Sequence, residues 1–390
     1  MMGHKSNPPR RRKRTAVLLF ILIVLIAVLL GGGWYFSNVV RDAALQPKRV
    51  DLRPQLEVVA LGEDRITLGV TGELQNDDWR KDGIWGLRWN EGYAQVGKII
   101  DINDQEVVRE FAPLMGKLSI GDRVGLYIFA FPDDPEQAFG LPTRKVSYSS
   151  GLGQFPAWLI EGSSNTWLIV VHGKKDAPPR EALRSYPVLP VAAEFGIPTL
   201  IISYRNDVGA PASPDGFHRY GQTEWQDLQG AVEYAIEHGA EQLILMGYSM
   251  GGAMILNFLY QSQLADKVVG IILDAPMLNF GATVESGAMQ LGVPLFFVAI
   301  GKFISTLRFD INWEDLNYIS RVDQLTLPLL LFHGDADTTV PIEISDSLAT
   351  RWLSMLTYAP IHGATHIRSW NINPDLYEKE VSRFLQELIE

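Results

Sequence analysis

The fold of this chain is set around residues 242–252, which read Gln-Leu-Ile-Leu-Met-Gly-Tyr-Ser-Met-Gly-Gly. The apolar run Leu243–Met246 is typical of a buried strand, and Ala253–Tyr260 directly after the stretch is helix-forming. Between them, Gly-x-Ser-x-Gly supplies the tight turn of a nucleophile elbow, in which a serine is held exposed at the edge of a sheet. The start of the following helix favours negative charge beside that serine. The sequence therefore predicts Ser249 as a nucleophile.

On both sides of this stretch, apolar strands alternate with helical segments from about residue 144 to the C-terminus. The predicted strands are Ala157–Glu161 and Thr166–His172 (joined by a turn at 162–165), Thr199–Tyr204, Gln242–Met246, Val268–Leu273, Leu327–Phe332 and Met355–Tyr358. The predicted helices are Glu181–Glu194, Thr223–His238 (opened by the capping-box pair Thr223 and Gln226), Met250–Gln261, Ile342–Leu353 and Pro374–Ile389. This alternation predicts an α/β fold, with a mostly parallel sheet and helices on both faces. Ligands of such sheets bind at the carboxyl ends of the strands.

A nucleophilic serine needs a base to take its proton and an acid to orient that base. After a nucleophile elbow the expected chain order is Ser, acid, His. Three histidines lie downstream of Ser249, at positions 333, 362 and 366. Asp335 and Asp337 both lie in the loop after a strand, and His362 and His366 both lie in the loop before the last helix. Spacing alone leaves both choices open.

Taken together, four motifs in this order resemble the α/β-hydrolase superfamily, in particular the branch of serine aminopeptidases, monoacylglycerol lipases and related membrane-anchored esterases. The matching residues are Val171–Lys174, Gly247–Gly252, His333–Pro341 and Gly363–His366. The resemblance covers roughly Lys145–Glu390. It implies Ser249 as the nucleophile, Asp337 as the orienting acid and His366 as the base. It also implies an oxyanion hole formed by the backbone N–H groups of Met250 and Lys174.

The N-terminus has the features of a membrane anchor. Residues 1–14 carry six basic side chains and no acidic one, and the apolar segment Ala16–Phe36 spans 21 residues, or about 31 Å of helix. We therefore expect a single-pass protein of the cell membrane, with a cytoplasmic basic tail (1–14), a transmembrane anchor (15–37) and an extracytoplasmic catalytic domain. A cleaved signal peptide is the alternative, but no clear cleavage site follows the apolar run.

Between the anchor and the hydrolase-like segment, we expect a linker at 38–53 and a small β-rich domain at 54–143. Short apolar runs broken by Gly, Asp and Asn indicate the strands of that domain: Leu56–Leu61, Arg65–Thr71, Gly86–Trp89, Val96–Ile102 and Val124–Phe131. The hydrolase-like domain is expected at 144–390, with a candidate lid at 281–312. The apolar segment Leu291–Ile304 within it is either a lipid-facing lid or a helix packed in the core.

Composition narrows the function further. The net charge of −11 leaves −17 on residues 15–390, so nucleic acid is not an expected partner. The chain has no cysteine, which excludes disulfides, thiolate metal sites and a cysteine nucleophile. No phosphate-binding loop or metal-ligand spacing is evident, so neither a cofactor nor a metal is expected. The function expected is a serine hydrolase acting on small-molecule or lipid esters. A peptidase and a catalytically idle binding protein are the alternatives.

Overall fold

The computed structural model of the chain describes residues 10–47, 54–72, 77–132, 134–174, 187–352 and 355–389. The chain divides into two compact units. The smaller comprises Met1–Gln46 and Val284–Glu314, and the larger comprises Pro47–Thr283 and Asp315–Glu390.

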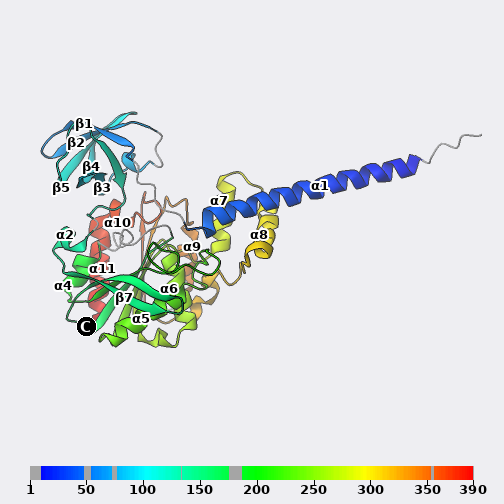
Figure 1. Cartoon of the computed structure of the whole chain (residues 1–390). Helices are drawn as coiled ribbons and strands as arrows, with labels where there is room; N and C mark the ends of the chain where they lie inside the picture. The colour runs from blue at the N-terminus through cyan, green and yellow to red at the C-terminus, as the bar shows by residue number, and fades with distance from the viewer. Residues whose placement is uncertain are drawn as a thin grey trace, which may run out of the picture. The chain divides into compact units, whose positions relative to one another are not determined.

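An eight-stranded sheet lies at the centre of the larger unit, with the order β14-β13-β12-β11-β9-β10-β8-β7 (Figure 1). Its strands are β7 (Thr143–Ser150), β8 (Gly153–Ile160), β9 (Thr166–Val171), β10 (Thr199–Ile202), β11 (Gln242–Tyr248), β12 (Val268–Asp274), β13 (Leu329–Gly334) and β14 (Leu356–Ile361). Neighbouring strands run parallel from β10 through β9, β11, β12 and β13 to β14. At the other edge of the sheet, β8 pairs antiparallel with both β10 and β7. The predicted mostly parallel sheet is confirmed.

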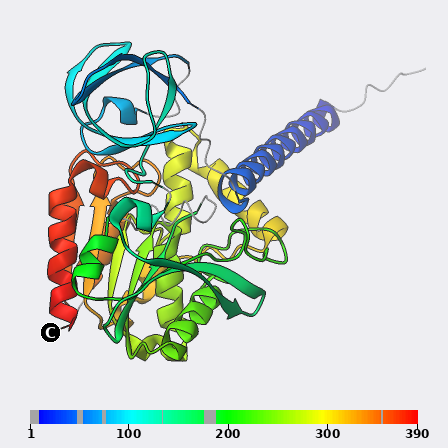
Figure 2. The same ribbon diagram turned by 60° about the vertical axis from the view of Figure 1, so that its left-hand side comes forward.

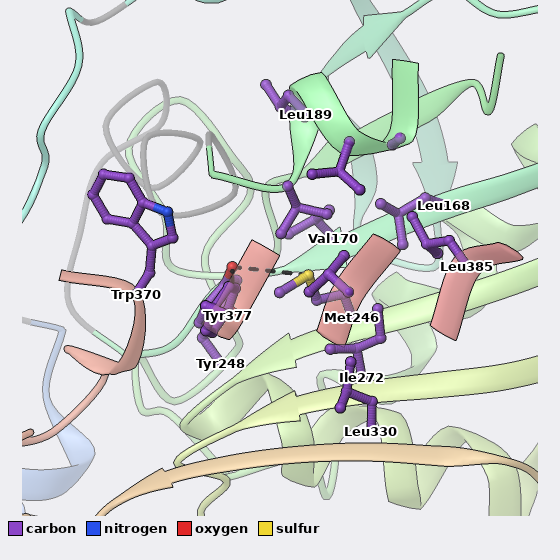
Figure 3. Close-up of a cluster of buried hydrophobic side chains, with 14 of the residues drawn as sticks. Leu168, Val170, Leu189, Met246, Tyr248, Ile272, Leu330, Trp370, Tyr377 and Leu385 are labelled. Atoms are coloured by element: carbon purple, nitrogen blue, oxygen red, sulfur yellow. Dashed lines mark hydrogen bonds between the residues drawn. The ribbon is translucent and has the colours of Figure 1, made fainter. Parts of the chain in front are cut away.

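Helices cover both faces of this sheet. They are α4 (Leu189–Glu194), α5 (Trp225–Glu237), α6 (Met250–Gln261), α9 (Glu343–Arg351), α10 (Ser369–Ile372) and α11 (Pro374–Ile389), with 3-10 turns η3 (Gln263–Lys267) and η4 (Tyr318–Gln324). Figures 1 and 2 show α11 on one side of the sheet and α5 with α6 on the other. Alternate residues of the central strands, such as Val170 and Met246, pack with Leu189 of α4 and Leu385 of α11 in one apolar cluster (Figure 3). Every residue of β9 is buried, as expected for a strand covered on both faces.

The turn predicted at 162–165 joins β8 to β9, although β10 lies between these two strands in the sheet. The turn donates the N–H groups of Ser163 and Ser164 to the carbonyl of Gly196. Helix α5 begins at Trp225 rather than Thr223, because the Glu224 carboxylate is engaged by the backbone N–H groups of residues 219 and 221. Of the helix predicted at 181–194, only α4 lies within the described residues.

The β-rich domain is a closed barrel with the strand order β1-β2-β5-β4-β3-β6. Its strands are β1 (Leu56–Leu61), β2 (Arg65–Val70), β3 (Trp85–Trp89), β4 (Gly92–Ile102), β5 (Glu106–Met115) and β6 (Arg123–Tyr127), with a 3-10 turn η2 (Asp78–Arg80) before β3 and a short helix α2 (Pro135–Phe139) after the barrel. Sequence reasoning missed β5, where Arg109 and Glu110 interrupt the apolar pattern. The Arg109 side chain is nevertheless buried in the barrel, where it donates hydrogen bonds to the backbone carbonyls of Gly97 and Lys81.

The smaller unit is built on a long N-terminal helix, α1 (Arg10–Val40), which continues through a π-helical turn, η1 (Arg41–Leu45). Within the described residues it is long and apolar enough to cross a membrane over Arg14–Leu45. The helix therefore extends past Phe36 into the segment expected as a linker. The reason is that no proline follows until Pro47, so nothing in residues 37–45 breaks the helix.

The candidate lid consists of helices α7 (Phe280–Gln290) and α8 (Leu295–Phe309). In the smaller unit, α8 packs against α1 through glycines. A Cβ on Gly33 would lie 2.6 Å from Ile300, and a Cβ on Gly301 would lie 2.2 Å from Phe36. Arg308 stacks on Trp34 with its guanidinium carbon 3.7 Å from the ring centre. Small residues of this kind bring two helix backbones close together.

A second face of α8 is exposed and apolar. It carries Phe296, Phe303 and Leu307, which are 54%, 64% and 70% exposed. These residues have the i, i+7, i+11 spacing of one helical stripe. One stripe of α8 therefore packs on α1, and the other is left exposed by the residues that the structure describes.

Candidate active site

Ser249 lies in a strained turn between β11 and α6. Its φ is +49° and its ψ is −114°, a backbone conformation that residues other than glycine rarely adopt. The backbone N–H of Ser249 donates to the carbonyl of Asp274, and its carbonyl accepts from Met277. Gly251 must lack a side chain, because a Cβ there would lie 2.3 Å from the carbonyl oxygen of Val171. Tight packing of α6 on the end of β9 thus holds the serine in place.

Three of the predicted residues form one hydrogen-bonded chain. His366 Nε2 lies 2.9 Å from Ser249 Oγ, and His366 Nδ1 lies 2.7 Å from Asp337 Oδ2. A carboxylate can only accept, so Nδ1 carries the proton and Nε2 is left to accept the serine hydroxyl. This is the arrangement in which an imidazole can take a proton from the serine.

Asp337 is held rigidly from several directions. Its side chain is fully buried, and its Oδ1 accepts the backbone N–H groups of Thr339 and Val340 at 2.8 and 3.0 Å. His333 Nε2 lies 3.3 Å from its Oδ2. Burial raises the pKa of Asp337, but the facing His366 and the hydrogen-bonding His333 outweigh burial and hold the pKa well below its ordinary value. The carboxylate therefore stays charged beside the imidazole.

The two residues that spacing could not exclude form a separate pair on the surface. His362 Nδ1 donates to Asp335 Oδ2 at 2.7 Å, and the Gly363 N–H donates to Asp335 Oδ1 at 2.7 Å. The His362 side chain is 98% exposed. Asp335 thus organises the loop before His366, while Asp337 is the carboxylate that contacts His366.

The residues expected to form an oxyanion hole are Met250, at the start of α6, and Lys174, in the loop after β9. Met250 is the first residue of α6, so its backbone N–H is one of those left without a partner inside the helix. Lys174 follows Gly173, whose carbonyl accepts hydrogen bonds from the His172 ring at 2.7 Å and the Tyr204 hydroxyl at 2.7 Å. In a trans peptide the carbonyl and the next N–H point in opposite directions. The Lys174 N–H is thereby directed away from Tyr204.

Further buried polar groups support these loops. His172 Nε2 lies 2.8 Å from Asp207 Oδ2, and both side chains are buried. Ser369 donates to Asp274 at 2.8 Å. Burial raises the pKa of Asp274 from 3.8 to about 7, against the opposing effect of the Ser369 hydrogen bond. Asp274 ends strand β12 at the carboxyl edge of the sheet, which is a position where the sequence could have signalled it.

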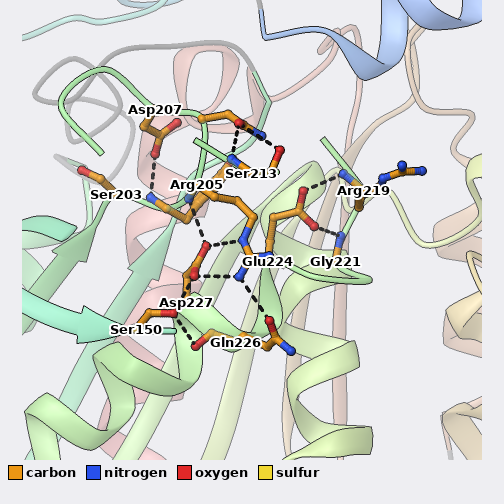
Figure 4. A network of polar contacts seen from close by, with 12 residues as sticks. Ser150, Ser203, Arg205, Asp207, Ser213, Arg219, Gly221, Glu224, Gln226 and Asp227 are labelled. Carbon is orange, nitrogen blue, oxygen red and sulfur yellow. Dashed lines mark hydrogen bonds and ion pairs between the residues drawn. The ribbon is translucent and has the colours of Figure 1, made fainter. Parts of the chain in front are cut away.

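Arg205, two residues before Asp207, stabilises the fold through a buried ion pair. Arg205 forms a buried double hydrogen bond with Asp227 at 2.7 and 2.9 Å, and Ser150 donates to the same carboxylate at 2.7 Å (Figure 4). Glu224 accepts two backbone N–H groups nearby. This network joins β7, the loop after β10 and helix α5. Among the residues that the structure describes, no group of three or more His, Asp or Glu side chains could hold a metal ion.

Two segments of the chain match models of known protein families. Residues 209–321 match the family model of the S33 serine aminopeptidases, and residues 57–126 match a domain of unknown function, DUF8805. The first segment contains Ser249 but neither Asp337 nor His366. The second coincides with most of the barrel.

Among individual proteins, the uncharacterized protein YfhR of Escherichia coli is 22% identical over 272 residues, which are 67% of this chain and 88% of YfhR. The structure of the Pyrococcus furiosus esterase Pf2001 aligns with a TM-score of 0.50 and 19% identity, covering 64% of this chain and 93% of that one. The Butyrivibrio proteoclasticus protein Est1E, solved with bound ferulic acid, aligns with a TM-score of 0.47 and 18% identity, covering 63% of this chain and 99% of that one. At 19% identity, the alignment with Pf2001 shows a similarity of fold alone.

Proposed function

We propose that this chain, whose C-terminal domain has the α/β-hydrolase fold, is a membrane-anchored serine hydrolase that cleaves carboxylic esters. The observation that carries the proposal is the hydrogen-bonded chain from Ser249 through His366 to Asp337. Its three members come from separate loops at the carboxyl edge of the sheet, where ligands of such sheets bind.

In the proposed mechanism, Ser249 Oγ attacks the carbonyl carbon of the ester while His366 Nε2 takes the hydroxyl proton. The charged Asp337 stabilises the imidazolium that forms. The backbone N–H groups of Met250 and Lys174 stabilise the negative oxygen of the tetrahedral intermediate, each by roughly 10²–10³ in rate. His366 then protonates the leaving alcohol. Water, deprotonated by His366, then attacks the acyl-enzyme. As the second tetrahedral intermediate collapses and the acid leaves, His366 returns that proton to Ser249 Oγ.

The substrate class that we favour is a lipid ester presented by the membrane. Helix α1 is long and apolar enough to cross a bilayer, and α8, which carries the exposed apolar stripe, packs on α1 through its other face. An apolar helix face next to a membrane helix is stabilised when lipid covers it. The basic residues before the apolar segment support a cytoplasmic N-terminus, with the hydrolase domain on the opposite side of the membrane.

The test is hydrolysis of p-nitrophenyl esters, from acetyl to palmitoyl, by the full chain in detergent. We expect Ser249→Ala to lower kcat by roughly 10⁴-fold or more, and Asp337→Asn to lower it by about 10⁴-fold because the imidazole loses its orienting charge. The chain supplies its own control. His362→Ala removes a 98% exposed histidine of the surface pair and should stay within about threefold of wild type.

Peptide substrates are the competing class, and the matching p-nitroanilides of amino acids form the second arm of the assay. Ser249-dependent cleavage of anilides without cleavage of esters would replace the esterase proposal with a peptidase. Equal ester turnover by wild type and Ser249→Ala would rule out the proposed nucleophile.

A further inference from the structure

We propose that the barrel domain positions the catalytic histidine, through an ion pair between Asp78 and Arg368. This inference rests on the proposed function, because it concerns how His366 is held against Ser249. It assigns a role to the domain that contains residues 57–126.

The contact runs through one arginine. Arg368 Nη2 lies 2.8 Å from Asp78 Oδ2, and Arg368 Nε lies 3.2 Å from the same oxygen. The other terminal nitrogen, Nη1, donates to the backbone carbonyl of His366 at 2.6 Å. The guanidinium therefore joins a carboxylate of the barrel to the backbone of the histidine.

The ion pair between Asp78 and Arg368 is largely buried, and Asp78 lies on a turn that is anchored in the core of the barrel. The side chains of Asp78 and Arg368 are only 7% and 18% exposed, so water screens the pair weakly. Asp78 begins the 3-10 turn η2, and the next residue, Trp79, is buried in the apolar core of the barrel. A charged pair of this kind keeps a fixed geometry, because its planar donors match the carboxylate.

The backbone at Ile367, between His366 and Arg368, is strained and needs contacts from its surroundings to keep its conformation. Ile367 has a φ of +53°, a conformation that is costly for a β-branched residue and persists only when its surroundings impose it. Arg368 holds the carbonyl directly before Ile367. Without that contact, we expect the residue to relax toward a negative φ, which would rotate His366 away from Ser249.

Hydrogen bonds of Asn371, a few residues later, also connect this loop to the barrel domain. Asn371 Nδ2 donates to the carbonyls of Ile84 and Ile128 at 2.7 and 2.8 Å, and the Ile84 N–H donates to the Asn371 carbonyl at 2.8 Å. Gly83, with a φ of +123°, makes room for this contact, because a Cβ there would lie 2.3 Å from the Asn371 oxygen. The segment from His366 to Asn371 is thus held from the barrel at both ends.

The experiment compares Asp78→Asn with wild type in the full chain. We expect kcat for a p-nitrophenyl ester to fall roughly 10- to 100-fold with KM changed less than about twofold, because misplacing a catalytic group by about 1 Å costs up to about 10² in rate. Asp78→Glu, which keeps the charge, should recover part of the loss. Asp77→Asn is the matched control, since it removes the neighbouring exposed carboxylate, and its kcat should equal that of wild type.

A double-mutant cycle separates positioning from general damage. If Asp78 acts through Arg368, then Asp78→Asn combined with Arg368→Met should be no slower than Arg368→Met alone. Losses that multiply, or a kcat of Asp78→Asn equal to wild type in a folded protein, would overturn the proposal.

Hydrogen exchange of the peptide covering residues 362–373 gives a readout that needs no substrate. We expect faster exchange in Asp78→Asn than in wild type and in Asp77→Asn, with unchanged exchange in helix α11. Unchanged exchange in the loop would overturn the positioning role even if the chain hydrolyses no ester. Conversely, faster exchange in a protein without Ser249-dependent activity would uphold the positioning and refute the proposed function.

Discussion

At the scale of single residues, this site contains two Asp–His pairs of similar sequence and different surroundings. Asp337 and His366 are shielded from water and reach Ser249, whereas Asp335 and His362 meet on the surface. Burial makes the difference in chemistry. The buried carboxylate of Asp337 can stabilise an imidazolium at His366, because little water screens their interaction. Water screens the interaction between the exposed side chains of Asp335 and His362.

Asp274 provides a pH prediction at the same scale. Because burial raises its pKa to about 7, the folded state binds a proton more tightly than the unfolded chain between about pH 4 and pH 7. Its contribution to stability is therefore present at low pH and lost as the pH rises through about 7. The unfolding free energy of the wild type should therefore fall between pH 5 and pH 7.5. In Asp274→Asn, this fall should be smaller than in the wild type by roughly 2 kcal/mol.

Urea unfolding followed by tryptophan fluorescence at both pH values measures this difference. Asn keeps an oxygen that can accept from Ser369, so the hydrogen bond survives in the variant. The same pH dependence in wild type and variant would show that Asp274 titrates near its ordinary value.

At the scale of elements, the unit from β11 through the turn to α6 determines where Ser249 lies. In Gly251→Ala, the added methyl group would meet the backbone carbonyl of Val171, which cannot move without displacing β9. We expect a loss of about 1–3 kcal/mol in stability and more than a 10-fold loss in ester hydrolysis.

Gly287→Ala is the matched control for this prediction. Gly287 lies in helix α7, and a Cβ there has no neighbour within 4 Å among the described atoms. This change should leave hydrolysis unaltered and raise stability slightly, by about 0.5–1 kcal/mol. Thermal unfolding and the ester assay test both variants. Normal activity in Gly251→Ala would mean that the turn tolerates a wider separation of α6 from β9.

At the scale of the whole molecule, the proposed lipid contact gives a prediction about membrane substrates. Replacing Phe296, Phe303 and Leu307 together by serine removes the uncovered stripe of α8 but leaves its packing residues on α1 unchanged. For a long-chain ester embedded in phosphatidylcholine–phosphatidylglycerol vesicles, we expect the apparent KM to rise about 10-fold, because three large apolar groups no longer enter the lipid. Turnover of soluble p-nitrophenyl acetate should not change.

Ile120→Ser serves as the control in that experiment, since Ile120 is a 67% exposed apolar residue of the barrel domain. It should alter neither substrate. A triple serine variant with wild-type kinetics on vesicles would exclude lipid as the group that covers this stripe.

Features that depend on neighbouring residues could be predicted from the sequence. The turn at Ser249 could be predicted because an apolar strand, three glycines and a helix-forming segment lie within about twenty residues. Helix α6 (Met250–Gln261) and helix α11 (Pro374–Ile389) begin and end where the pattern placed them. The apolar N-terminal helix likewise follows from composition alone. In each case the interactions that decide the structure are local hydrogen bonds and a continuous apolar pattern.

Contacts between distant residues could not be predicted from the sequence and became visible in the folded chain. Spacing could not separate Asp337 from Asp335 or His366 from His362, because the choice depends on how the loops after β13 and β14 approach a serine 117 residues before His366. The pair between Asp78 and Arg368 joins residues 290 positions apart. The position of β10 between β8 and β9 was equally hidden. Such contacts depend on strand order and domain packing, which no local pattern records.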